Sequence, residues 1–245
     1  EQEGVVFPLR LFVWSCPRGA AVDRLPKPGE GAPSCGFFHM PRRRRGGKGG
    51  RTVSLIQIEH LYFTYDGGSE PVFEDLDLQL DTDWKLGLVG RNGRGKTTLL
   101  RDLIRALSDG DGVPPMRVGV ADERGELAAM CEGVPQFQIG SHSDVLDGCP
   151  KGQGLLMLLR GMNPQVMAAD EITAPEDVAA LEMAANCGVA LLATAHGAGL
   201  EDLRRRPLYR RLLSLNVFQR LVVITVENGG RRYAVHTLED GICCG

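Results

Sequence analysis

The sequence predicts an α/β fold, in which a parallel β-sheet is flanked by helices and preceded by a small antiparallel β patch. From residue 84 to residue 236, short apolar segments alternate with segments whose apolar residues recur at helical spacing. Such alternation of strands and helices is typical of a parallel sheet that carries helices on both faces. A glycine-rich loop between the first of these strands and the first helix indicates where a ligand binds.

The β patch is expected from two segments before the glycine-rich loop. Residues 55–65 are rich in apolar and aromatic side chains, and Asp-Gly-Gly at residues 66–68 is a turn signal. Residues 72–80 alternate apolar and polar side chains, which predicts a half-buried strand. We therefore expect an antiparallel pair ahead of the main sheet.

The main sheet and its helices follow in a regular order. Leu99, Leu100, Leu103 and Leu107 lie at helical spacing, so they predict one buried face of the first helix. We expect strands over residues 84–89, 116–121, 165–169, 188–195, 218–226 and 232–236, and helices over residues 98–107, 154–162, 175–186 and about 199–213.

The glycine-rich loop fits the pattern G-x-x-x-x-G-K-[ST], which binds phosphate in P-loop NTPases of the RecA-like and ABC-like kinds. Backbone N–H groups of such a loop surround phosphate oxygens, and the helix N-terminus adds partial positive charge. We expect ATP and Mg²⁺ as cofactors, with Lys96 on the β- and γ-phosphates and the Thr97 hydroxyl on the metal. A chance match of a glycine-rich turn is the alternative, and the flanking strand and helix argue against it. The expected nucleotide-binding residues are Gly90, Arg91, Asn92, Gly93, Arg94, Gly95, Lys96, Thr97 and Thr98.

Two carboxylates follow the predicted strand over residues 165–169. In a P-loop enzyme the first acid holds the Mg²⁺ shell and the second polarises the attacking water. We assign the metal role to Asp170 and the base role to Glu171. An apolar strand followed by two acids also occurs by chance, so this prediction depends on its place behind the phosphate-binding loop.

Two further strand ends carry polar residues. Thr194 and His196 end one strand, at the rim where ligands bind in open parallel sheets, and they could sense the γ-phosphate. The alternative is a histidine satisfied by its neighbouring loop. Glu123 or Asp122 could orient the attacking water, and Arg124 could meet phosphate or a neighbouring subunit. A surface ion pair is the alternative for this group.

Charge is unevenly distributed along the chain of 245 residues, whose net charge is −3. Residues 1–53 carry ten Lys/Arg and four Asp/Glu, and the remainder carries 18 and 27. Proline, glycine and an arginine run in residues 1–53 predict a disordered basic leader. Such a run could bind nucleic acid or acidic lipid, but a solvated tail is the favoured interpretation, and we expect no other segment to bind nucleic acid. The chain begins without Met, and we hypothesise that natural translation starts near Val53, which would make the leader non-native.

Cysteine usage and hydropathy bear on the cellular compartment. The seven cysteines are irregularly spaced and form no C-x-x-C pair, which favours a reduced, cytoplasmic protein. No apolar run approaches the ~18 residues typical of a membrane span. We expect any contact with a membrane to be peripheral.

From about residue 95 to residue 239 the chain resembles the stage III sporulation AA ATPases, of the RecA-like secretion type. The resemblance rests on residues 95–104, 118–126, 144–151, 162–172 and 191–197. It implies a cytoplasmic, homo-oligomeric and hexameric motor that energises a channel between mother cell and forespore, with channel proteins as partners at the membrane. The family usually has Arg-Thr at Ser141-His142, Ala-Glu at Gly152-Gln153 and Gly at Thr173. Motor activity is in question if the arginine that is replaced here contacts nucleotide or a neighbouring subunit.

Residues 54–100 are similar to the opening of an ABC-F ATP-binding cassette, in which Tyr65 would stack on adenine. The Leu-Ser-Gly-Gly-Gln signature of cassettes is missing. Both resemblances share Gly-Lys-Thr-Thr-Leu-Leu at residues 95–100, so we hypothesise a chimera joined there. The expected organisation is a leader over 1–53, a P-loop ATPase domain over 54–240, and a tail over 241–245. Within the domain, residues 54–94 form a cassette-like β subdomain and 95–240 a sporulation-type core.

These patterns predict Mg-dependent ATP binding and hydrolysis, with the sporulation motor as the specific interpretation. Two alternatives stay open. One is an ABC-F type protein that acts on ribosomes, and the other is a nucleotide-binding module without turnover.

Overall fold

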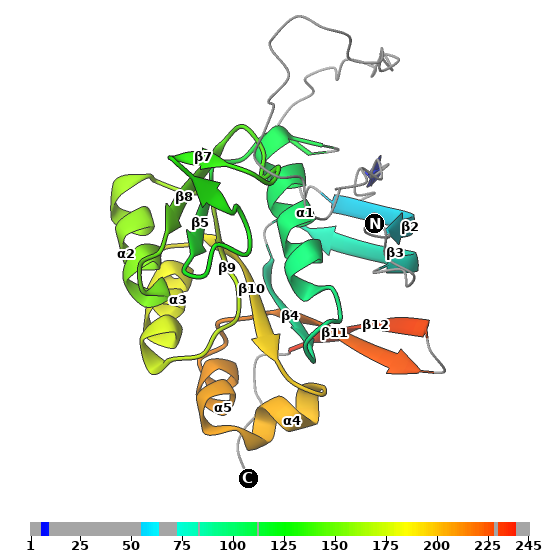
Figure 1. The fold of residues 1–245 in the computed structure, drawn as a ribbon. Coiled ribbons are helices and arrows are strands. Elements are labelled where there is room, and N and C mark those ends of the chain that lie inside the picture. The colour runs from blue at the N-terminus through cyan, green and yellow to red at the C-terminus, as the bar shows by residue number, and fades with distance from the viewer. Residues whose placement is uncertain are drawn as a thin grey trace, which may run out of the picture.

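A computed structural model describes residues 6–9, 55–63, 73–82, 84–111, 113–227 and 230–238. Its centre is a seven-stranded sheet of order β12-β11-β4-β10-β9-β5-β8 (Figure 1). All neighbouring pairs are parallel except β11 and β12. The strands are β4 (Lys85–Gly90), β5 (Val118–Asp122), β8 (Ser143–Asp147), β9 (Val166–Ala169), β10 (Ala190–His196), β11 (Arg220–Glu227) and β12 (Gly230–Thr237). The predicted α/β class with a parallel sheet is confirmed.

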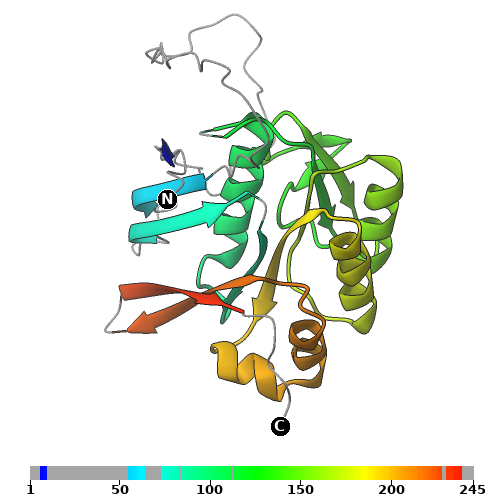
Figure 2. The same ribbon diagram turned by 180° about the vertical axis from the view of Figure 1, so that it is seen from behind.

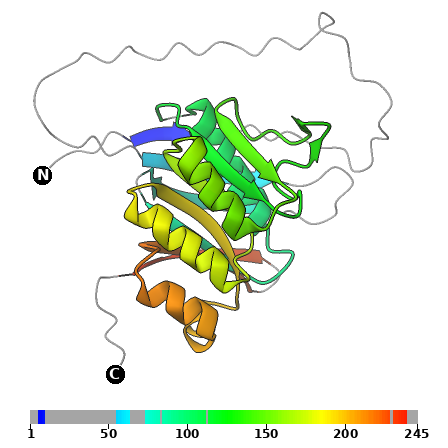
Figure 3. The same ribbon diagram turned by 90° about the vertical axis from the view of Figure 1, so that its left-hand side faces the viewer.

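Helices cover both faces of this sheet (Figures 1 and 2). They are α1 (Lys96–Asp109), α2 (Lys151–Gly161), α3 (Pro175–Asn186), α4 (Leu200–Arg205) and α5 (Pro207–Ser214). Apolar residues of α1 share one core with alternate residues of the central strands, such as Leu86 and Leu88. The other helices pack on the opposite face around residues such as Leu191 and Ala193. Figure 3 shows α2, α3 and α5 side by side on that face.

A second sheet lies on the α1 side and shares its core. Its order is β1 (Val6–Leu9), β2 (Leu55–Phe63) and β3 (Phe73–Asp81). The β2–β3 pair is antiparallel, as predicted for the β patch. We expected residues 1–53 to lack structure, and at residues 6–9 this is wrong, because this apolar segment pairs in parallel with β2. The rest of the leader, the turn at 66–68, Tyr65 and the tail over 241–245 lie outside the described residues.

Three elements differ from the sequence prediction. The single helix expected over 199–213 is two helices, because Arg206 is extended (φ −86°, ψ 125°) and Pro207 starts α5. Strand β8 was not expected, since none of its residues is fully buried and its sequence does not alternate regularly between apolar and polar side chains. The short hairpin of β6 (Met130–Cys131) and β7 (Val134–Pro135) was also missed. Within the described part of the chain, no helix is both long enough and apolar enough to span a membrane.

Candidate nucleotide-binding site

The carboxyl ends of the parallel strands meet at one edge of the main sheet, and the glycine-rich loop lies there between β4 and α1. Gly93 and Gly95 have φ values of 72° and 85°, a left-handed conformation that glycine adopts without strain. No side chain caps the first turn of α1. Its backbone N–H groups therefore offer the donors that bind phosphate at helix N-termini.

Lys96 begins α1 and folds back over the loop. Its Nζ donates to the carbonyl oxygens of Gly90 at 2.8 Å and Arg91 at 3.1 Å. Burial lowers the pKa of Lys96, while the carboxylates of Asp170 and Glu171 raise it. The lysine thus lies at the phosphate-binding loop and faces the acidic group at the end of β9.

Asp170 follows β9, and two hydroxyl groups hold its carboxylate. The Thr97 hydroxyl donates to Asp170 Oδ2 over 2.9 Å, and the Thr194 hydroxyl donates to Oδ1. One β-strand, β10, lies between β4 and β9, so the fold brings together residues that are far apart in sequence. Hydroxyl and carboxylate oxygens are hard ligands that suit Mg²⁺, which is usually held by one or two carboxylates together with waters and phosphates. The residues therefore fit the metal, although no cluster of three His, Cys, Asp or Glu ligands occurs among the described residues.

Glu171 is held on several sides. It has a φ of 48°, and its N–H donates to the Thr194 hydroxyl over 2.7 Å. Its Oε2 lies 2.5 Å from an Arg124 guanidinium nitrogen. Lys151 Nζ donates to its backbone carbonyl over 2.7 Å. The carboxylate predicted as a base therefore lies beside Asp170, in an ion pair with Arg124.

The two acids at the end of β5 have different surroundings. Asp122 is buried and accepts hydrogen bonds from the N–H groups of Leu127 and Ala128, so it shapes the following loop. Its predicted role on a water molecule does not fit this arrangement. The Glu123 carboxylate is 3.4 Å from Lys151 Nζ and lines a small hollow together with Asp170 and Glu171.

Sequence reasoning did not single out Glu126, which also lines this hollow. Partial burial raises the pKa of the Glu126 carboxyl, and the adjacent Asp170, with which it shares a hydrogen bond, raises it further. Three carboxylates thus gather near Lys96. The sequence signal was weak, because Glu126 lies in a loop without periodicity, four residues after Asp122.

His196 ends β10 next to the loop. Its Nδ1 is 2.9 Å from the Asn92 side-chain oxygen, and its carbonyl accepts from Arg206. Arg231 of β12 donates to the Gly93 carbonyl over 3.2 Å, so the edge strand also reaches the loop. His196 therefore contacts a neighbouring loop, as the alternative interpretation states. That loop is the phosphate-binding loop itself.

The Ser141-His142 departure lies elsewhere. Ser141 N and Oγ both donate to Asp109, and His142 N donates to the Ser108 hydroxyl. These contacts are at the C-terminal end of α1, ~20 Å along the helix from Lys96 at 1.5 Å per residue. Within one chain, these two residues hold the end of α1 and do not line the loop.

The fold and this arrangement of residues define a P-loop nucleotide-binding domain. The chain belongs to the family described as "Sporulation stage III, protein AA", whose model matches residues 69–240. The predicted resemblance is confirmed, and the match begins earlier than residue 95, the expected boundary.

Individual proteins show where the likeness is strongest. The chain is 43% identical over 143 residues to stage III sporulation protein AA of Bacillus subtilis, which covers 58% of this chain and 47% of that protein. It is 33% identical over 142 residues to the uncharacterized protein ycf45 of Porphyra purpurea, covering 57% and 24%. Over 55 residues it is 40% identical to the ATP-dependent lipid A-core flippase of Nitrosococcus oceani, covering 22% and 9%. The chain thus spans less than half the length of these relatives.

Solved structures give a more distant likeness. The VirB11 ATPase of the Brucella suis type IV secretion system is 18% identical, with a TM-score of 0.45, over 62% of this chain and 47% of that one. The pilus retraction motor PilT with bound ADP has the same identity and TM-score, over 62% and 46%.

Proposed function

We propose that this chain binds ATP with Mg²⁺ and hydrolyses it. The observation that carries the proposal is the contact between Thr97 Oγ1 and Asp170 Oδ2, at 2.9 Å. It joins the phosphate-binding loop to the end of β9, as a site for a metal-bound triphosphate requires. Family membership supports the same conclusion.

Each residue has a role in this proposal. The loop amides of residues 90–98 and Lys96 bind the phosphates, and Thr97 and Asp170 hold the metal. When bound, Mg²⁺ would neutralise negative charge on the phosphates. Glu171 accepts the proton of the attacking water, and Glu123 lies close enough in the same hollow to orient that water. His196 senses the γ-phosphate through Asn92 of the loop.

The specific role that we propose is that of the sporulation motor. A homo-oligomer, hexameric by family resemblance, would energise a channel between mother cell and forespore. The name of the Bacillus subtilis relative supports a role in sporulation. Whether the cassette-like opening is joined to a sporulation-type core, as a chimera, stays a prediction.

A second candidate is a nucleotide-binding module without turnover. The departure at Ser141-His142 favours it, because an arginine that is usual in the family is replaced there. Substitution Glu171→Gln in the full chain separates the two candidates. In an enzyme it should abolish Mg-dependent ATP hydrolysis and leave ATP binding intact, whereas the exposed Glu176→Gln should change neither. If the unsubstituted, folded protein binds ATP without turnover, the chain is a binder.

A further inference from the structure

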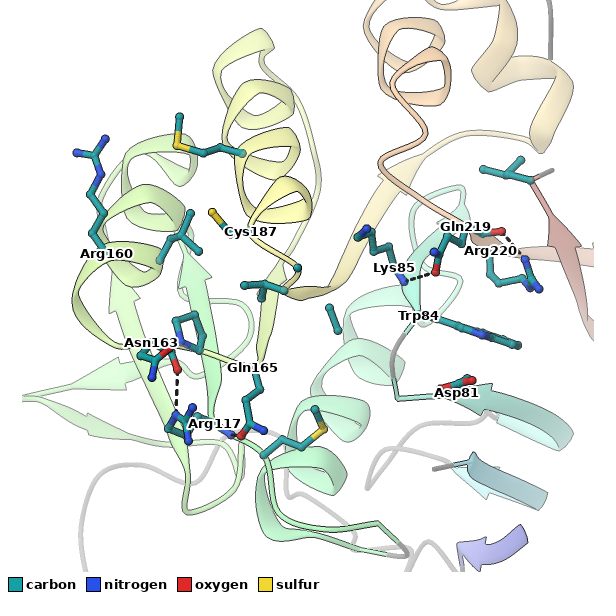
Figure 4. Close-up of a pocket in the computed structure, with 18 of the residues that line it drawn as sticks. Asp81, Trp84, Lys85, Arg117, Arg160, Asn163, Gln165, Cys187, Gln219 and Arg220 are labelled. Atoms are coloured by element: carbon teal, nitrogen blue, oxygen red, sulfur yellow. Dashed lines mark hydrogen bonds between the residues drawn. The ribbon is translucent and has the colours of Figure 1, made fainter. Parts of the chain in front are cut away.

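A large pocket lies at the edge of the main sheet opposite the nucleotide site (Figure 4). Strands β4, β5, β9 and β10 begin at this pocket and end at the phosphate-binding loop and its acidic partners. Along β4, the two sites are ~17 Å apart at about 3.3 Å per residue. A ligand in this pocket therefore does not compete with ATP for space.

Four cations line the pocket on two walls. Arg117 and Arg160 come from the β5 and α2 side, and Lys85 and Arg220 from the β4 and β11 side (Figure 4). Asp81 is the one acid among the lining residues, in a body where Asp and Glu outnumber Lys and Arg. The pocket is thus positively charged although the domain as a whole is negatively charged. This positive charge would attract an anionic ligand.

In the part of the chain that the structure describes, none of these four cations is neutralised by an ion pair, and carbonyl groups hold two of them. Arg117 Nε donates to the Asn163 carbonyl over 2.9 Å, and Arg220 donates to the carbonyl of Gln219 over 2.9 Å. Among the ion pairs of the described residues, none involves Lys85, Arg117, Arg160 or Arg220. Carbonyl contacts fix the position of a guanidinium group and leave its charge available for a carboxylate.

The rest of the lining is mixed: Asn163, Gln165, Gln219 and Thr237 are polar, and the other side chains are mostly apolar. Met116, Leu159, Pro164, Val189 and Leu238 are among the apolar residues of the pocket. Its volume is about 1300 Å³, above the ~300–1,000 Å³ of small-molecule sites.

Among the described residues that line the pocket, Trp84 is the one with an aromatic side chain. The guanidinium group of Arg220 lies 4.8 Å above its ring, so this face is not open for base stacking. A ligand that carries carboxylates for the four cations and apolar side chains for the apolar part of the lining fits best.

We propose that this pocket binds an acidic peptide segment of a protein partner, one that also carries apolar side chains. Carboxylates contact Arg117, Arg160, Lys85 and Arg220, and apolar side chains fill the space between the two walls. The site is separate from the nucleotide loop, and the proposal does not depend on ATP turnover.

Fluorescence anisotropy of the full chain tests this with a labelled peptide of Glu-Leu-Asp repeats. Peptides of Gln-Leu-Asn repeats and of Glu-Ser-Asp repeats remove charge and apolar contacts, respectively. We expect the first peptide to bind more than tenfold tighter than either, with affinity that falls as salt rises. Binding should also change Trp84 fluorescence, and Trp84→Phe should remove this change.

Paired charge reversals locate the binding. Arg117→Glu with Arg160→Glu should weaken the peptide at least tenfold, whereas Arg205→Glu with Arg210→Glu, exposed on α4 and α5, should not. Retained ATP binding shows that each variant is folded. Equal losses in both variants would overturn the proposal. The proposal would also be overturned if a single-stranded oligothymidine competed with the peptide and bound more tightly. A chain that ends at Leu238 provides a further test, because tenfold tighter peptide binding by that chain would identify residues 239–245 as the occupant.

Discussion

Lys151 Nζ donates a hydrogen bond to the backbone carbonyl of Glu171 over 2.7 Å, at the point where Glu171 leaves β9 in a left-handed conformation. The same ammonium group lies 3.4 Å from Glu123 and 3.9 Å from Asp177. The Lys151 side chain is 4% exposed. One buried cation therefore joins the loops after β5 and β9 to the first turns of α2 and α3, and fixes the backbone of the candidate base.

Replacing Lys151 by Met should destabilise the protein by about 3 kcal/mol, because the buried carboxylate of Asp177 loses its charged partner. ATP turnover should fall more than tenfold, since Glu171 loses its backbone donor, while ATP affinity changes less. Urea unfolding and steady-state kinetics measure the two effects. Lys85→Met, at the opposite edge of the sheet, is the control, and equal behaviour of the two variants would contradict the role given to Lys151.

The Arg124–Glu171 ion pair should matter for activity more than for stability. Its side chains are 55% and 27% exposed, and exposed pairs contribute about 0–1 kcal/mol. Arg124→Ala should therefore change the free energy of unfolding by less than about 1 kcal/mol. Turnover should fall about tenfold, because the Glu171 carboxylate loses its orientation. If turnover is unchanged, the Arg124–Glu171 contact is a surface ion pair without a role in activity, as the alternative interpretation states.

Thr194 is fully buried, and its hydroxyl links Asp170 to the Glu171 N–H. Thr194→Val keeps the shape and removes the hydroxyl, so both partners lose a hydrogen bond. The expected loss of stability is about 1–3 kcal/mol. The Mg²⁺ concentration that gives half-maximal turnover should rise. Thr173→Val, at an exposed position, serves as the comparison, and a similar response from both variants would refute the prediction.

Burial raises the pKa of Asp102 on α1 from 3.8 to about 6. The folded protein then keeps a proton that the unfolded chain has already released. The stabilising contribution is full below pH 3.8 and is lost as the pH rises through 6.

Asp102→Asn cannot ionise, so at pH 7.5 this variant should be more stable than the parent by up to about 3 kcal/mol. Below pH 4 the difference should vanish. Urea unfolding at both pH values measures it, with the exposed Asp144→Asn as control. A variant that is less stable at pH 7.5 would show that the Asp102 carboxylate is stabilising.

The sequence predicted the elements that depend on local signals. The bounds of α3 match residue for residue, because Pro175 is favoured at a first helical position and Asn186 is followed by a turn. Strand β8 had no such signal, since pairing with β5 defines it and none of its residues is fully buried. The break between α4 and α5 was readable from Pro207, which restricts the residue before it.

For the site, the glycine-rich motif predicted Lys96 and Thr97, and the acids after the strand over residues 165–169 predicted Asp170. The structure brings these three residues together. Contacts across elements could not be read from the sequence. Glu126 beside Asp170, and Lys151 under Glu171, depend on how α2 and the loop after β5 pack at the edge of the sheet. No periodicity or spacing encodes such contacts.

The most direct test of the central claim is steady-state ATP hydrolysis by the full chain with and without Mg²⁺, beside Lys96→Ala. If the loop after β4 and the acids after β9 form one working site, turnover requires Mg²⁺ and is lost in the variant. Mg-dependent turnover that persists in folded Lys96→Ala would contradict this site. The absence of turnover from the folded, unsubstituted protein would contradict it too.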